Sequence, residues 1–200
     1  AFVLFRIPLA LTIIQILAVD LGTDMLPALA LGAEKTDPEV MKRPPRARSE
    51  RLLSWGMLAR AYLFLGVLEA TAAMFAFFFV LDAAGWQYGQ LFDRTDPLYL
   101  QATSACLATI VVMQMVNLYL CRHPRRSSLS YGFAGNRYLQ FGIVAELAVI
   151  LFILYTPAGN WLFGTTPIGN ATWLLAVGCA ALMWTLEELR KALLRRTTKD

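Results

Sequence analysis

Two aspartates and a threonine lie close together in an apolar stretch near the start of the chain. Asp20 and Asp24 are four residues apart, so on a helix they share a face, with Thr23 beside them. Two carboxylates this close in apolar surroundings repel each other, and they need a cation between them or a proton on at least one. Hard cations such as Na⁺, K⁺ and Ca²⁺ prefer oxygen ligands. The pattern predicts a cation site. The alternative is a carboxylate pair that binds Arg or backbone donors in a protein core.

The backbone around these aspartates is expected to depart from a regular helix. Gly22 lowers helix propensity, and Pro27 lacks a backbone N–H to donate. A locally unwound helix could turn carbonyl oxygens toward an ion, as the broken helices of membrane transporters do.

Further polar side chains interrupt the other apolar stretches. Glu146 could be a ligand, a proton site or a hydrogen-bonded packing residue. Gln114 and Asn117 are three residues apart and share a helix face, where amides could coordinate a cation or bridge helices. Glu69 lies in a run of small residues suited to close helix packing, which favours a structural interpretation. Arg60 is interpreted as structural too, because its long side chain can reach the membrane surface.

The elements that must position these side chains are predicted to be membrane-spanning helices. The 200-residue chain is 58% hydrophobic and only 16% charged, which excludes an ordinary soluble domain and a disordered chain. Its three Cys, an odd number, all lie in or at the edge of apolar stretches, which excludes a disulfide scaffold. A helix needs roughly 20 mostly apolar residues to cross a bilayer. The stretches that qualify are residues 8–31, 52–81, 98–120, 138–155 and 171–189.

The first residues suggest that more protein precedes them. The chain does not begin with Met, and Ala1–Phe5 is apolar without the order of a signal peptide. We expect this segment to be the last turn of another helix, in a fragment of a larger protein. The predicted fold is therefore all-α: a polytopic membrane helix bundle of five transmembrane helices plus the end of a preceding one.

The distribution of Lys and Arg predicts the orientation in the membrane. Of the 18 basic residues, 15 lie in residues 33–51, 122–137 and 187–200, whereas the other two connections hold only Arg94. Basic segments face the cytosol. The N-terminal end is therefore expected outside and the C-terminal tail in the cytosol. The basic excess reflects topology and contact with anionic lipid, and no nucleic-acid partner is expected.

Two polar connections carry motifs of their own. The Pro-bounded, highly charged segment from Asp37 to Arg46 suits docking to a soluble domain. Ser127 and Ser128 follow two arginines, as in a basic-directed phosphorylation site, but a basic loop produces such strings by chance. The sequence has no Gly-rich phosphate loop, zinc-ligand spacing or Ser/His/Asp set. Its only His, His123, lies in a basic loop, so a histidine metal site is not expected.

Two blocks of sequence carry a resemblance to a known family. Residues 19–28 (VDLGTDMLPA) and 37–46 (DPEVMKRPPR) are similar to the sixth membrane helix and following loop of P-type cation-transporting ATPases. The branch that they resemble holds the calcium pumps and the sodium/potassium pumps. The later segments that look like the seventh to tenth helices are 49–54, 112–118, 141–146 and 188–196. The resemblance therefore covers nearly the whole chain.

The resemblance implies roles for particular residues. The family couples ATP hydrolysis to cation transport through an aspartyl phosphate, with ion sites between the fourth, fifth, sixth and eighth membrane helices. The implied cation ligands, from the sixth, eighth and ninth helices, are Asp20, Thr23, Asp24, Gln114, Asn117 and Glu146. The loop implied to contact the phosphorylation domain carries Asp37, Lys42, Arg43 and Arg46.

Three of the implied ligands differ from family patterns. Calcium pumps usually have Asn in place of Asp20, and the sarcoplasmic-reticulum type has Glu in place of Gln114. The sodium/potassium type has Asp in place of Asn117. The transported cation is left open among Na⁺, K⁺ and Ca²⁺, and Asp20 leans toward the sodium/potassium and proton/potassium pattern.

The predicted organisation follows from the spans and the resemblance. Its parts are 1–32, the end of one helix and the ion-binding helix; 33–51, a cytosolic charged loop; 52–190, a four-helix bundle; and 191–200, a basic cytosolic tail. The predicted function is the membrane part of an ATP-driven primary cation pump, with ATP and Mg²⁺ bound by domains outside these residues. The expected partners are the lipid bilayer and the rest of the same polypeptide.

The rival hypothesis is a non-catalytic channel or structural membrane module. An Asp-Lys-Thr-Gly-Thr phosphorylation motif upstream of Ala1 would favour the pump, and a start codon directly before Ala1 would favour the rival.

Overall fold

The computed structural model describes residues 7–34, 53–90, 92–131 and 135–197, and within these ranges the chain is helical and without β-strands. The helices long and apolar enough to cross a membrane are Ile13–Gly32, Trp55–Ala83, Pro97–Cys121, Arg137–Tyr155 and Asn170–Arg196. Each predicted stretch coincides with one of them, and the last continues beyond its predicted end at Leu189. The prediction of an all-α, polytopic membrane bundle is confirmed.

The spans are assembled from regular and widened helical segments. The first consists of α2 (Ile13–Leu17), the π-helical segment η1 (Ala18–Thr23) and α3 (Met25–Gly32). The second consists of α4 (Trp55–Leu58), the π-helical segment η3 (Ala59–Leu65) and α5 (Gly66–Ala83). The other spans are α6 (Pro97–Cys121), α7 (Arg137–Tyr155) and α9 (Asn170–Thr197). The connections hold a 3₁₀ turn, η4 (Ser128–Tyr131), and the short helix α8 (Pro157–Phe163).

Side-chain caps set where several helices begin. At the start of α2, the Thr12 hydroxyl accepts a hydrogen bond from the Gln15 N–H while the Gln15 side chain accepts one from the Thr12 N–H. Asp96 caps α6 ahead of Pro97, which suits the first helical position because it has no N–H to satisfy. Asn136 caps α7 in the same way as Asp96.

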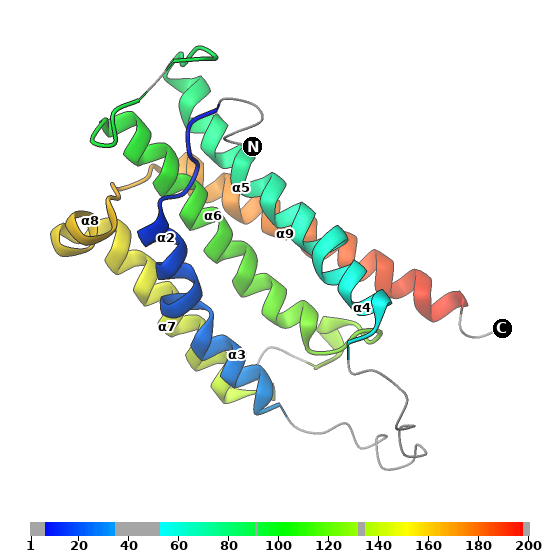
Figure 1. Cartoon of the computed structure of the whole chain (residues 1–200). Coiled ribbons are helices and arrows are strands. Elements are labelled where there is room, and N and C mark those ends of the chain that lie inside the picture. The colour runs from blue at the N-terminus through cyan, green and yellow to red at the C-terminus, as the bar shows by residue number, and fades with distance from the viewer. Residues whose placement is uncertain (1–6, 35–52, 91, 132–134, 198–200) are drawn as a thin grey trace.

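Helix α6 is the centre of the bundle. It packs against α5 and α9 on one side and against α3, η1 and α7 on the other (Figure 1). The α5–α6 contact contains fully buried side chains such as Phe77 and Leu107. The first span is tied to α6 by Gln15, a fully buried residue whose amide donates to the Thr103 hydroxyl (3.3 Å) and to the Gly164 carbonyl (3.2 Å).

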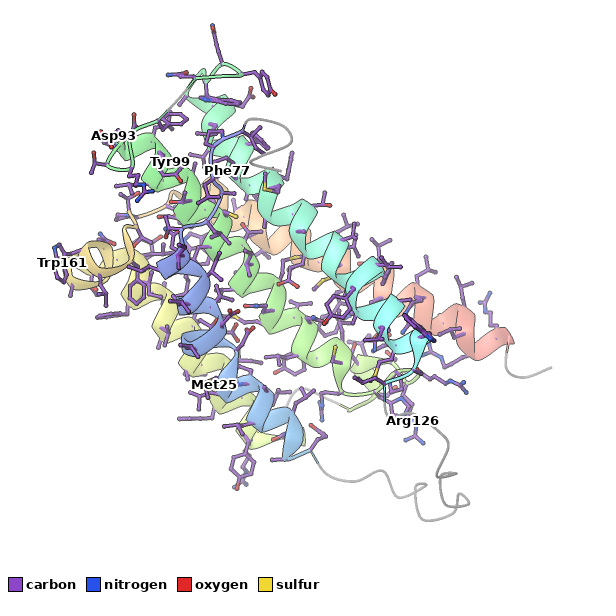
Figure 2. The ribbon with its side chains drawn as sticks, in the orientation of Figure 1. Met25, Phe77, Asp93, Tyr99, Arg126 and Trp161 are labelled. Carbon is purple, nitrogen blue, oxygen red and sulfur yellow. The ribbon has the colours of Figure 1, made fainter. Side chains whose placement is uncertain are left out.

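The two ends of the bundle differ in charge. Asp93, in the connection between α5 and α6, and Arg126, in the connection after α6, lie at opposite ends (Figure 2). The C-terminal end of α9 lies at the same end as Arg126 (Figure 1), and there Arg195 donates a hydrogen bond to the Arg125 carbonyl. The described connections therefore alternate between a basic end and a non-basic end.

A glycine allows the first span to approach α7 closely. A Cβ atom at Gly142 would lie 3.2 Å from the Cα and 3.3 Å from the N of Pro27. Both are backbone atoms of a buried residue, so they cannot move aside as the end of a flexible side chain would. Gly142 thus sets how near α3 and α7 can come.

We expect Gly142→Leu to separate α3 from α7 and to lower the free energy of unfolding by about 1–3 kcal/mol, the usual cost of overpacking. The measurement is thermal unfolding of the purified protein in detergent. Gly178→Leu is the matched control, because no atom lies within 4 Å of a Cβ placed at this exposed position of α9. Equal midpoints for the two variants would contradict the prediction.

Candidate cation site

A cavity with several polar side chains in its lining lies between α3, α5, α6 and α7, inside the membrane-spanning part of the bundle. Its volume is about 330 Å³. Its polar lining consists of Asp24, Glu69, Gln114, Asn117 and Glu146. None of the described residues that line it is basic. The cavity thus brings together three carboxyl groups and two amides from four helices.

Asp24 and Gln114 are joined directly across the cavity. The Gln114 amide nitrogen donates a hydrogen bond of 3.1 Å to a carboxylate oxygen of Asp24. The amide oxygen of Gln114 is buried and has no hydrogen-bond partner among the described residues. Gln114 therefore holds Asp24 in place and still has an oxygen free to face a cation.

Glu146 is the least compensated residue of the cavity. Its side chain is 2% exposed, and neither carboxyl oxygen has a hydrogen-bond partner in the described part of the chain. Asp24 and Glu69 are close enough for their charges to repel that of Glu146. A carboxyl group in this position must either carry a proton or, if it is ionised, have a cation beside it, because a buried charge without a partner costs several kcal/mol.

The π-helical segment η1 contains Asp20 and ends directly before Asp24. The Asp24 N–H donates to the Val19 carbonyl, five residues earlier, at 3.0 Å. This bond adds one residue to the turn and widens it. Asp24 enters the cavity, whereas the side chain of Asp20 is exposed and does not line it. The predicted loosening is thus a widened turn and not an unwound stretch.

Thr23 also lies outside the cavity lining. Its side chain is buried, and its hydroxyl donates a hydrogen bond of 2.9 Å to the Val19 carbonyl. The Val19 carbonyl therefore accepts two hydrogen bonds, which stabilises the widened turn. Of the six predicted ligands, Asp24, Gln114, Asn117 and Glu146 line the cavity, whereas Asp20 and Thr23 do not.

Glu69 is the cavity residue to which the sequence interpretation gave a structural role. It lies on α5 among small residues, yet its carboxyl group faces Asp24 closely enough to feel its charge. The small residues of α5 do have the packing role expected of them, since Ala72, Ala73 and Ala76 are buried. Its charge inside an apolar span was the signal available in the sequence.

Asn117 and Arg60 have partners of their own. The Asn117 side-chain oxygen accepts a hydrogen bond of 3.3 Å from the Cys121 thiol. Arg60 lies outside the cavity lining and forms an ion pair of 2.6 Å with Glu187 of α9. Arg60 also donates to the Leu120 carbonyl at 3.2 Å, so it joins three helices in a structural role.

The loop residues implied to contact another domain, Asp37, Lys42, Arg43 and Arg46, lie outside the described residues. Within the described ranges, no group of three or more His, Cys, Asp or Glu side chains is compact enough to hold a metal ion by itself. A cation in the cavity would therefore depend on amide and carbonyl oxygens, or on groups beyond these residues, in addition to the carboxylates.

The fold and the cavity together define an integral, multi-pass membrane protein with a polar site inside its spans. The family described as "Cation transporting ATPase, C-terminus" matches residues 8–193. The chain belongs to this family, the C-terminal membrane region of P-type cation-transporting ATPases.

The curated relatives carry consistent names. The sodium/potassium-transporting ATPase subunit alpha of Hydra vulgaris and the subunit alpha-3 of Homo sapiens are each 32% identical over 220 residues. The subunit alpha-1 of Oreochromis mossambicus is 30% identical over the same length. The matches cover 98% of this chain but only 21% or 22% of the relatives. The chain spans about a fifth of their length.

We expect Glu146→Gln to stabilise the purified protein in buffer without Na⁺, K⁺ or Ca²⁺. At alkaline pH, where Glu146 has lost its proton, its charge is repelled by Asp24 and Glu69, whereas an amide has no charge, so the free energy of unfolding at that pH should rise by about 1–3 kcal/mol. The measurement is the midpoint of thermal unfolding. The control is Asp82→Asn, at an exposed position near the end of α5. A midpoint that stays unchanged or falls in Glu146→Gln would contradict an uncompensated carboxylate.

Proposed function

We propose that the chain is the membrane part of an ATP-driven primary cation pump of the sodium/potassium-pump type and supplies ligands to an intramembrane cation site. Its membership of the cation-transporting ATPase family and the names of its relatives support the class. The observation that carries the site is the cavity in which Asp24, Glu69 and Glu146 meet two amides without a basic lining residue in the described part of the chain.

The cavity favours cation binding over the alternatives. A structural carboxylate pair would have Arg or backbone donors as partners, but Glu146 has none among the described residues and Asp24 is bound by a neutral amide. A purely structural membrane module would gain nothing from carboxyl groups that repel one another. Oxygen ligands of this kind suit Na⁺, K⁺ and Ca²⁺, and the relatives named for sodium and potassium favour the monovalent ions.

Asp20 and Thr23 remain proposed ligands of a site that extends beyond this chain. Asp20 is exposed on the first span, and exposed apolar residues such as Leu17 and Leu21 lie near it in the sequence. Membrane helices supplied by another part of the same polypeptide would cover this face and bring their own ligands. The relatives are about five times as long as the chain, so they have room for such helices.

The remaining parts of the proposal concern orientation and the rest of the pump. The basic end of the bundle faces the cytosol, so residues before α2 enter from outside and the tail after α9 is cytosolic. The loop with Asp37, Lys42, Arg43 and Arg46 contacts the phosphorylation domain, while ATP and Mg²⁺ bind to domains outside the chain. Residues 1–32, 33–51, 52–190 and 191–200 are the proposed divisions, and α9 continues without a break across the last boundary.

We expect Asp24→Asn in the full-length protein to abolish cation-dependent phosphorylation by ATP, because it removes a carboxylate that the cavity orients through Gln114. The measurement is the level of phosphorylated protein as Na⁺, K⁺ or Ca²⁺ is varied, which also identifies the cation. Asp82→Asn, outside the cavity, should retain the wild-type response. An unchanged cation affinity in Asp24→Asn would refute the proposed site.

We expect Glu69→Gln to raise the cation concentration for half-maximal phosphorylation by roughly tenfold or more, the usual effect of losing a group that supports a metal site. The matched control is Thr71→Val, two residues away on α5, whose exposed side chain donates to the Val67 carbonyl of its own helix. A wild-type response in Glu69→Gln would assign Glu69 to helix packing alone.

A further inference from the structure

A second polar cluster lies beyond the cavity, where the first span ends. Its members are Glu34, just after α3, Arg122 at the C-terminal cap of α6, and Asn136 at the N-terminal cap of α7. We call these three residues the Glu34 cluster. The side chain of Arg122 is only 3% exposed and that of Glu34 is 23% exposed. The cluster therefore joins the ends of three spans in a largely buried position.

Arg122 donates hydrogen bonds to both carboxylate oxygens of Glu34. Its Nη2 donates to Oε1 at 2.6 Å and its Nε donates to Oε2 at 3.2 Å. Such a two-point contact fixes the relative orientation of the two side chains, which a Lys could not do. Because Arg122 is almost completely buried, loss of Glu34 would remove an anionic partner from a desolvated guanidinium.

Asn136 completes the cluster by using both ends of its amide. Its oxygen accepts from the backbone N–H groups of Tyr138 and Leu139 and so caps α7. Its nitrogen donates to Glu34 Oε2 at 2.8 Å and to the Ala30 carbonyl at 3.0 Å. The Ala30 carbonyl belongs to the last turn of α3, where carbonyls lack helical partners. The amide thus connects the start of α7 to the end of α3.

The same stretch of α3 forms a wall of the cavity. Asp24, Pro27, Ala28 and Leu31 all line it. Glu34 follows Asp24 by ten residues, which is about 15 Å along a helix axis. The partners of Glu34 extend from α6 and α7, the helices that carry Gln114 and Glu146. The cluster therefore anchors the helix of Asp24 to the two helices whose side chains face Asp24.

We propose that Arg122 and Asn136 are positioning residues for the cation cavity: by holding Glu34 and Ala30 they fix α3 against α6 and α7 and thereby set the cation affinity. This inference rests on the proposed function, since it concerns the same cavity. Neither residue lines the cavity, so each acts through the placement of α3.

The test uses Arg122→Gln and Asn136→Ser in the full-length protein. Serine retains an oxygen that can cap α7 but lacks the amide nitrogen that binds Glu34 and Ala30. Each variant is expected to raise the cation concentration for half-maximal phosphorylation by about three- to tenfold, with the maximal level retained. Combining Arg122→Gln with Glu34→Gln should add little to either single change, because both remove the same contact.

Arg195→Gln is the control, because Arg195 lies at the same basic end and contacts only the Arg125 carbonyl in the described structure. If the cluster has only a structural role, its variants will lose thermal stability or yield while the cation concentration for half-maximal phosphorylation stays unchanged. That result would overturn the positioning proposal. Asp24→Asn, measured alongside, separates the two hypotheses. If it too leaves the cation response unchanged, the proposed cation site fails; if it alone changes the response, only the positioning role fails.

Discussion

The structure depends on how each buried carboxylate is compensated. Elsewhere in the described bundle, a buried acid has a base beside it: Glu187 is fully buried and pairs with Arg60 and Arg190, and Glu34 pairs with Arg122. Asp24, Glu69 and Glu146 depart from this pattern, since no basic residue is among the described lining of their cavity. A helix bundle can be held together without such acids, so their presence calls for a positive charge that the described side chains do not provide.

The compensated and the uncompensated acids occupy different parts of the molecule. The ion pairs lie toward the basic end, where Arg60 and Lys191 both donate to the Leu120 carbonyl and join three spans. The cavity lies further along the same spans, between helices that are already anchored at their ends. Rigid ends and a polar middle suit a binding site, because ligands on separate helices keep their spacing when the site is empty.

The sequence was sufficient for the spans but not for the lining of the cavity. Apolar length located all five spans. Gln114, Asn117 and Glu146 were grouped with Asp24 through the resemblance to the cation pumps, and all of them line the cavity. Asp20 was predicted to be a ligand beside Asp24, but its exposed side chain does not line the cavity, which the spacing of the two residues could not reveal. The position of Glu69 depended on the rotation of α5 about its axis, which is set by the packing of side chains such as Phe77 against α6.

The widened turn η1 also has a consequence for how the chain can vary. Upstream of it, Gln15 is fixed by Thr103 and the Gly164 carbonyl, and downstream Asp24 is fixed by Gln114. A regular helix turns by about 100° per residue. The widened turn already holds one residue more than a regular turn, so deleting one residue between Ala18 and Thr23 would leave a regular helix in which both attachments keep nearly the same relative rotation. Inserting a further residue would instead rotate one attachment away from its partner by about that angle. The segment is therefore expected to tolerate the loss of one residue better than the gain of one.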